Sequence, residues 1–153
     1  MNYDPCMHHS AESGYQNPAN SVALAEYVVA KVEELYPNKE DGTVAIFGID
    51  NSSTFMAAFV KMLRPEWVFV SGSKYTGNFK NYSTLPQIRA AIFVDDYLYT
   101  GAASKCLVGM LNEKGMSCDL VICSIQTYWG IDKSLTMVQQ ALPKFGVKIL
   151  SLQ

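Results

Sequence analysis

The sequence predicts an α/β fold with a mainly parallel central sheet and helices on both faces. Apolar runs of strand length alternate with stretches of helical periodicity along most of the chain. This alternation is typical of strand–helix–strand units, which build parallel sheets covered on both sides. The chain has 153 residues, of which 49% are hydrophobic and 17% charged. It can therefore bury a sizeable core, and we expect one three-layer α/β/α domain over residues 1–153.

The first half of the chain predicts a long helix followed by strand, helix and strand. Residues 1–19 are polar and rich in Asn, Ser, Pro and Tyr, so we expect irregular structure there. A helical pattern runs from Asn20 to Tyr36, and Pro37 ends it. The next expected elements are a buried strand over 43–49, a loop over 50–53, a helix over 54–63 and a strand over 67–70.

The second half continues the alternation after a long polar segment. Residues 71–88 show no clear period, and a segment of this length inside a compact domain is usually functional or mobile. Asp132 is placed to cap the last helix. The expected elements are a strand over 90–95, a helix over 102–114, a strand over 119–124, a loop over 126–131, a helix over 132–142 and a strand over 147–152.

The stretch over residues 90–104 contains the residues most suggestive of a ligand-binding site. Five apolar residues predict a strand buried on both faces, and Asp95 and Asp96 follow at its carboxyl end. In open α/β sheets, ligands bind just outside the carboxyl ends of the strands. The small and hydroxyl residues that follow open a helix, whose free N–H groups suit a phosphate. Carboxylates suit sugar hydroxyls or hydrated Mg²⁺ instead. The stretch therefore fits a sugar phosphate; an ordinary strand–helix turn with Asp96 as a cap is the alternative.

This stretch resembles the PRPP-binding motif of the type I phosphoribosyltransferases. That motif is an apolar strand, an acidic pair and a loop close to Thr-Thr-Gly-Gly-Thr; here the loop reads Tyr99-Thr100-Gly101-Ala102-Ala103-Ser104. The resemblance implies that Asp95 and Asp96 hold the ribose hydroxyls and that residues 100–104 cradle the 5′-phosphate. It also implies transfer of ribose-5-phosphate from PRPP to a nitrogenous base, with Mg²⁺ bound through PRPP and water rather than by a metal site of the protein.

Further segments are similar, in order, to the orotate branch of this family over roughly residues 10–153. Asp50-Asn51-Ser52-Ser53 stands at the place of the pyrophosphate loop, and Ser73-Lys74 where the branch has Arg-Lys. The segment over 75–88, with Lys80, stands at the place of the loop that closes over the reaction. The resemblance implies that Lys74 and Lys80 steady the leaving pyrophosphate. A solvated Lys74 and a helix cap at Ser52 or Ser53 are the alternatives.

The loop after the fourth strand lacks the arginine with which the branch meets orotate. Thr127-Tyr128-Trp129-Gly130 stands there, so Tyr128 or Trp129 could stack on a neutral base, or both could form an aromatic lid on the core. The pyrophosphate-loop position is acidic at Asp50, whereas PRPP carries about five negative charges. These departures favour a second interpretation, a non-catalytic protein of this fold that binds PRPP or a nucleotide as a sensor or partner subunit.

Charge, motifs and cysteine content indicate which classes of partner and which cellular compartment to expect for this protein. A net charge of −2 argues against an obligate nucleic-acid partner, and no Gly-x-Gly-x-x-Gly or Walker sequence is present. The four cysteines, Cys6, Cys106, Cys118 and Cys123, lack metal-site spacing and are typical of a reducing compartment. No signal peptide or membrane span is predicted, so we expect a cytoplasmic protein. The family resemblance implies a homodimer, with PRPP and a nucleobase or nucleoside monophosphate as ligands.

Overall fold

A mainly parallel sheet forms the centre of the molecule. The computed structural model describes residues 18–37, 44–73, 79–80, 88–98, 102–113 and 118–152. Within these residues the sheet has six strands in the order β3-β2-β1-β4-β5-β6. The parallel strands are β1 (Val44–Ile49), β2 (Val68–Gly72), β4 (Ala90–Leu98), β5 (Asp119–Thr127) and β6 (Val147–Ser151). The short β3 (Phe79–Lys80) pairs antiparallel with β2. The predicted α/β fold is confirmed.

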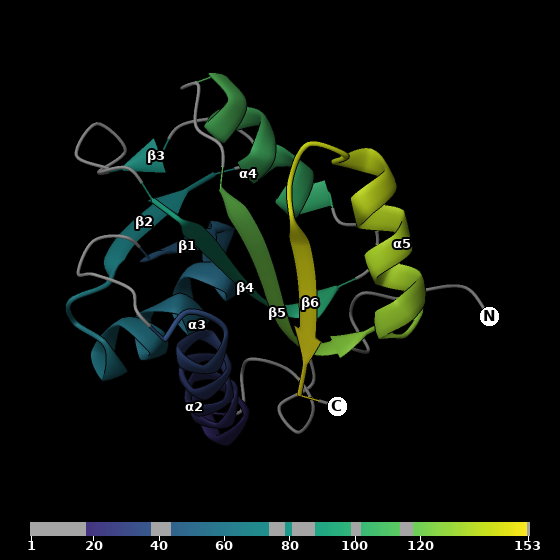
Figure 1. Ribbon diagram of the computed structural model, residues 1–153. Helices are drawn as coiled ribbons and strands as arrows, with labels where there is room; N and C mark the ends of the chain where they lie inside the picture. Colours follow the sequence, from purple (N-terminus) through teal and green to yellow (C-terminus); the bar gives the residue numbers. More distant parts are fainter. Residues whose placement is uncertain are drawn as a thin grey trace.

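Helices cover the two faces of the sheet in pairs. On one face lie α2 (Pro18–Leu35) and α3 (Asp50–Leu63), and on the other lie α4 (Ala102–Glu113) and α5 (Ile131–Ala141) (Figure 1). The central strands are buried on both faces, because successive side chains alternate between the two cores. The apolar runs that predicted the strands are therefore explained by double-sided burial.

The chain reverses its direction of winding between β1 and β4. From β1 it passes through α3 to β2 on one side, and it later returns to place β4 on the other side of β1. The following strands, β5 and β6, then continue outward from β4. Connections that diverge from two adjacent parallel strands open a crevice at their carboxyl ends. In folds of this kind the place where ligands are expected is therefore beyond the ends of β1 and β4.

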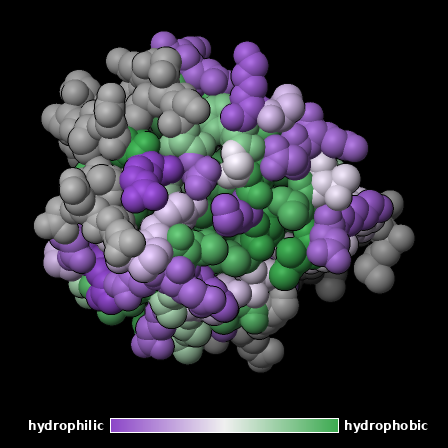
Figure 2. Space-filling view, viewed as in Figure 1, coloured by the Kyte–Doolittle hydropathy of each residue, from purple (hydrophilic) through white to green (hydrophobic). Residues whose placement is uncertain are grey.

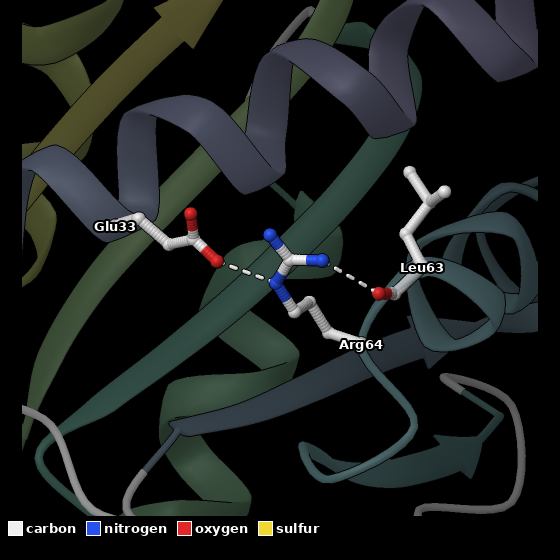
Figure 3. A network of polar contacts seen from close by, with 3 residues as sticks. All are labelled: Glu33, Leu63 and Arg64. Atoms are coloured by element: carbon white, nitrogen blue, oxygen red, sulfur yellow. Dashed lines mark hydrogen bonds and ion pairs between the residues drawn. The ribbon is translucent and has the colours of Figure 1, made fainter.

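Polar contacts fix α2 against the rest of the fold. The Tyr36 hydroxyl, just beyond α2, donates to Oδ2 of Asp119 at 2.8 Å, and burial together with this bond raises the pKa of Tyr36. Glu33 of α2 accepts a hydrogen bond from Nε of Arg64, which follows α3 (Figure 3). Arg64 also donates to the Leu63 carbonyl oxygen at 2.7 Å. The Glu33–Arg64 contact therefore joins the carboxyl-terminal ends of α2 and α3, and the Tyr36–Asp119 bond joins the end of α2 to the start of β5.

A glycine allows α3 to pack closely on β1. A Cβ at Gly48 would lie 2.6 Å from the Cα and 2.9 Å from the Oγ1 of Thr54. Both distances are shorter than van der Waals contact, so no larger residue fits without moving the helix. Gly48 therefore sets how near the first turns of α3 lie to the end of β1.

Several predicted boundaries are wrong at the carboxyl ends of the strands. Residues 50–53, predicted as a loop, form the first turn of α3. The strands predicted to end at residues 95 and 124 continue to Leu98 and Thr127, because these ends pair with each other. The last helix is preceded by Gly130, with φ of 85°, and has no side-chain cap, so the cap predicted at Asp132 is wrong.

The described surface mixes polar and apolar residues. In the space-filling view, hydrophobic residues reach the surface across the middle of the face shown, among hydrophilic ones (Figure 2).

Among the described helices, none combines the length and the apolar character needed to cross a membrane.

Candidate functional site

The fold brings two predicted parts of the site to one edge of the sheet. β1 and β4 are parallel neighbours, with Phe47 beside Phe93. Two residues further along their strands come Ile49 and Asp95, and Asp50 follows directly after β1. The expected pyrophosphate segment and the acidic pair, more than forty positions apart in the sequence, therefore meet at the switch point between the two strands.

The acidic pair lies within β4 rather than after it. Asp95 is half-buried, whereas Asp96 is only 5% exposed. Oδ1 of Asp95 accepts a hydrogen bond from the backbone N–H of Asp96 at 2.9 Å. Side chains alternate along a strand, so the two carboxylates leave β4 on opposite sides. The pair thus presents one accessible and one deeply placed carboxylate, and not two equivalent oxygen ligands.

Ser53 has a structural role in the first turn of α3. Its Oγ accepts a hydrogen bond from the N–H of Ile49 at 3.0 Å and donates to the carbonyl oxygen of Val94 at 2.5 Å. The side chain is buried. The predicted phosphate ligand Ser53 therefore uses its hydroxyl within the fold, and its backbone remains the part that can contribute to a phosphate site. Ser52 is half-buried, and the structure describes only the backbone of Asn51, in α3.

Asp50 turns the chain from β1 straight into α3. Its φ is 61°, the one positive value among non-glycine residues of the described chain. Asp tolerates this left-handed conformation better than most residues, but it still costs free energy. Strain of this kind gathers at functional sites, where the surrounding structure holds it. The positive φ explains how the strand passes directly into the helix without the predicted loop.

The expected phosphate cradle coincides with the start of α4. The helix begins at Ala102, whose backbone alone is described, and continues through half-buried Ala103 and buried Ser104. The Ser104 hydroxyl is 0% exposed and has no hydrogen-bond partner among the described residues. A buried hydroxyl of this kind requires a partner that the described chain does not supply. Thr100 and Gly101 lie outside the described residues.

Ser124 is a polar residue of this region that the sequence analysis missed. It lies on β5 in register with Asp95 on one side and with Ser151 of β6 on the other. Its hydroxyl is 0% exposed and lacks a hydrogen-bond partner in the described part of the chain. The signal was a serine at the carboxyl end of an apolar strand. In-register neighbours on adjacent strands share a face of the sheet. Asp95, Ser124 and Ser151 therefore form a row of polar residues across β4, β5 and β6.

Aromatic residues line the ends of β4 and β5. The Tyr128 ring lies edge-on to Trp129 at 4.4 Å between centroids and 6.4 Å from the ring of Tyr97. The Tyr128 N–H donates to the Leu98 carbonyl oxygen at 2.9 Å, which ties this loop to the end of β4. Trp129 is 40% exposed. The predicted base-binding residues thus stand at the same sheet edge as the acidic pair, one strand further along.

Lys133 is a second residue that the sequence analysis missed. Its Nζ lies 4.3 Å from the centroid of the Trp129 ring, which is within the range of a cation–π contact. The lysine is in the first turn of α5, four positions after Trp129. Because Trp129 precedes the helix, the sequence spacing did not predict that these two side chains are in contact. The exposed indole therefore already has a cation on its ring.

The cations predicted for the leaving group are only partly described. Lys74 lies outside the described residues, and Lys80 is described only as backbone in β3. Within the described ranges, no group of three or more His, Cys, Asp or Glu side chains could hold a metal ion.

Comparisons with known proteins identify the fold. No protein-family model matches the chain, and no curated protein matches its sequence. The adenine phosphoribosyltransferase of Saccharomyces cerevisiae, solved with an imino-sugar bisphosphate and adenine, is similar at TM-score 0.61 and 16% identity, over 91% of this chain and 82% of that one. The adenine phosphoribosyltransferase of Trypanosoma brucei, solved with AMP, pyrophosphate and ribose-5-phosphate, is similar at TM-score 0.64 and 13% identity, over 93% of this chain and 68% of that one.

A hypoxanthine phosphoribosyltransferase of Staphylococcus aureus is also similar. It gives a TM-score of 0.54 and 14% identity, over 98% of this chain and 82% of that chain. At these identities the likeness establishes the fold alone. The chain therefore has the phosphoribosyltransferase-like fold that its central motif predicted.

Proposed function

We propose that this chain is a phosphoribosyltransferase-like enzyme that transfers ribose-5-phosphate from PRPP to a nitrogenous base. The observation that carries the proposal is the position of Asp95 and Asp96. They stand in the carboxyl-terminal half of the central strand β4, at the switch point, and the next helix along the chain begins with small residues and a buried hydroxyl. Carboxylates suit the ribose hydroxyls and a helix N-terminus suits a phosphate, so both ends of a sugar phosphate find a partner.

In the proposed reaction the bond between C1 of the ribose and a pyrophosphate oxygen breaks. Pyrophosphate leaves with the bonding electrons, a ring nitrogen of the base forms the new C1–N bond, and the proton of that nitrogen passes to solvent. Asp95 and Asp96 orient the ribose, and residues 100–104 hold the 5′-phosphate. Lys74 and Lys80 neutralise the charge that develops on the leaving group. Mg²⁺ bound to PRPP would supply further charge neutralisation.

The acceptor base would lie against the aromatic cluster. Tyr128 and Trp129 offer ring faces and edges at the end of β5, and stacking favours a neutral base. Purine bases are the substrates named for the similar solved enzymes, whereas the order of sequence segments resembles the orotate branch. The proposal includes a single cytoplasmic domain over residues 1–153, acting as a homodimer with PRPP and a nucleobase or nucleoside monophosphate as ligands.

A second function is favoured by the pyrophosphate end of the site. Asp50 is acidic, and Ser53 uses its hydroxyl to hold Ile49 and Val94 rather than to face a ligand. A site that keeps the acidic pair but offers little to pyrophosphate suits a protein that binds PRPP or a nucleotide without turnover. Such a protein would act as a sensor or as a partner subunit.

Calorimetric titration tests the proposal. PRPP is titrated with and without Mg²⁺, beside ribose-5-phosphate and nucleoside monophosphates, into wild type and Asp95→Asn/Asp96→Asn. Asp132→Asn, a charge change on exposed α5, is the control variant. Mg²⁺-dependent PRPP binding that the double variant loses and the control keeps supports the site, and pyrophosphate release with a panel of bases then identifies the enzyme. PRPP or monophosphate binding without release supports the sensor. Binding of none of these ligands overturns both functions.

A further inference from the structure

The start of α5 presents hydrogen-bond donors beside the proposed base site. The helix begins at Ile131, directly after the loop that contains Tyr128 and Trp129. Gly130, which precedes it with φ of 85°, has no side chain, and the helix start has no side-chain cap. The Ser134 N–H closes the first turn by donating to the Gly130 carbonyl oxygen at 3.1 Å. The N–H groups of residues 131–133 therefore face the amino end of α5 without an acceptor in the helix, and the helix dipole adds partial positive charge there.

Lys133 adds a full positive charge to this helix start. Its side chain is exposed, and its Nζ lies 4.3 Å from the centroid of the Trp129 ring. A lysine ammonium group has three N–H donors and no acceptor, so it can bind an oxygen of a ligand but not an amino group. Because the side chain is flexible and exposed, it can leave the indole without a change in the packing of the core.

Two further polar residues belong to the start of α5. Ser134 is 2% exposed, and its hydroxyl has no hydrogen-bond partner in the part of the chain that the structure describes. Side chains of a helix lean toward its amino end, so this hydroxyl is directed to the end that carries the uncapped N–H groups. Asp132 is exposed and is the acidic residue of the first turn. Adjacent residues of a helix do not face each other, so its carboxylate leaves α5 on a different side from Lys133.

A base that stacks on Trp129 changes the position of Lys133. If the base takes the ring face that Lys133 now covers, the ammonium group is displaced and its cation–π contact is lost. An oxygen on the rim of the base gives the displaced ammonium group a charge-assisted hydrogen bond, which more than offsets this loss. An amino group at the same place is itself a donor, so it bonds neither to Lys133 nor to the uncapped N–H groups. The affinity for a base should therefore depend on whether its rim carries an oxygen or an amino group.

We propose that the acceptor is an oxo base, with a carbonyl oxygen on the rim that faces α5, and that Lys133 selects it over an amino base of the same ring system. This inference deepens the proposed function and rests on it, because it requires a base to stack at Tyr128 and Trp129. Lys133 is then a specificity-determining residue, which binds the acceptor and takes no part in breaking the bond between ribose and pyrophosphate. The selectivity depends on binding alone, so it applies equally to a protein that binds a nucleotide without turnover.

Calorimetric titration with matched nucleotides tests the role of Lys133. Inosine and adenosine 5′-monophosphates share the ribose phosphate and carry an oxo or an amino group at the same ring position, as do uridine and cytidine 5′-monophosphates. In wild type, the oxo member of the pair that binds is expected to have a Kd at least about tenfold lower than the amino member. Lys133→Met keeps the length of the side chain and removes its charge. The two Kd values should then differ by less than about threefold, chiefly because the oxo nucleotide binds more weakly.

Two further variants control for general effects on the site. Lys133→Arg keeps the charge and the donors, so it should keep the preference for the oxo nucleotide. Lys144→Met removes an exposed lysine beyond the other end of α5 and should leave both Kd values unchanged. All three variants should keep the circular-dichroism spectrum and melting temperature of wild type, since both positions are exposed.

The outcomes separate this inference from the proposed function. A wild type that prefers the amino nucleotide, or that binds both equally, would overturn the selectivity while nucleotide binding still supports the site. A preference that survives in Lys133→Met would show that another group selects the base. Binding of none of the four nucleotides to wild type would overturn the inference together with the base site on which it rests.

Discussion

The hydroxyl of Ser53 donates to the carbonyl oxygen of Val94 at 2.5 Å. This bond joins the first turn of α3 to the residue before Asp95, and the hydroxyl oxygen of Ser53 also accepts the N–H of Ile49. One buried side chain thus connects the ends of the two strands that diverge at the switch point. The position of the expected pyrophosphate segment relative to the acidic pair is set by this connection.

Replacement of Ser53 should destabilise the turn that joins these two parts of the site. Ser53→Ala leaves the Ile49 N–H and the Val94 carbonyl without their buried partner, so we expect a loss of about 1–3 kcal/mol in the free energy of unfolding. Urea denaturation measures it. Ser52→Ala, at the neighbouring half-buried position, should change stability by less than about 0.5 kcal/mol. Equal losses in the two variants would show that the bridge is not what stabilises this turn.

Two glycines should respond oppositely to alanine. At Gly48 a Cβ would collide with the backbone of Thr54, so Gly48→Ala should cost about 1–3 kcal/mol. Gly109 is exposed on α4, and the position that a Cβ would take there has no atom within 4 Å. Gly109→Ala should therefore stabilise the protein by about 0.5–1 kcal/mol. Thermal denaturation of both variants gives the comparison. A destabilised Gly109→Ala or an unaffected Gly48→Ala would contradict the packing described for these helices.

Stability should fall in alkaline solution. Burial raises the pKa of Cys118 from 9.0 to about 11, and burial with the Asp119 bond raises that of Tyr36 above its ordinary value of 10.0. A group whose pKa is higher in the folded state stabilises it below the unfolded pKa and loses this contribution as pH rises toward the folded value. Melting temperature should therefore drop from about pH 9 upward. Cys118→Ala should remove the part between pH 9 and about 11, and Tyr36→Phe the part that begins near pH 10.

The aromatic cluster should affect the base and not the sugar. If a base stacks on Trp129, Trp129→Ala should raise the KM for the base by about threefold to tenfold, the equivalent of roughly 0.5–1.5 kcal/mol, and leave the KM for PRPP unchanged. Ile131→Ala, two positions away and similarly exposed, is the control. Steady-state kinetics with each substrate varied in turn separates the two constants. An equal change in both would indicate that Trp129 supports the fold and does not contact the base.

The sequence predicted the fold because its signals were local. The apolar run before Asp95, the small residues after it and the alternation of strands with helices each depend on neighbouring residues. These features place the acidic pair at a strand end without any knowledge of the partner strands. The orotate branch, the base and the roles of individual site residues stay predictions.

What the sequence did not predict depends on contacts between distant segments. The extension of β5 to Thr127 arises from pairing with Leu98, and the two-residue β3 exists only through its pairing with Ser71 and Gly72. The start of α3 at Asp50 requires a positive φ that helix propensity does not indicate. Ser124 became visible only when register placed it beside Asp95.

The strand order also determines when the site can exist during synthesis. β4 is inserted between β1 and β5 in the sheet, but it follows β1, α3 and β2 in the chain. A nascent chain on the ribosome can form the β1–β2 unit early, yet one edge of β1 stays open until β4 has emerged. Such an edge of apolar strand can pair with other chains. In the finished protein β4 fills the place beside β1 and carries the acidic pair there. Until β4 has been synthesised, that same place is an open edge of β1 at which the partly synthesised chain can aggregate.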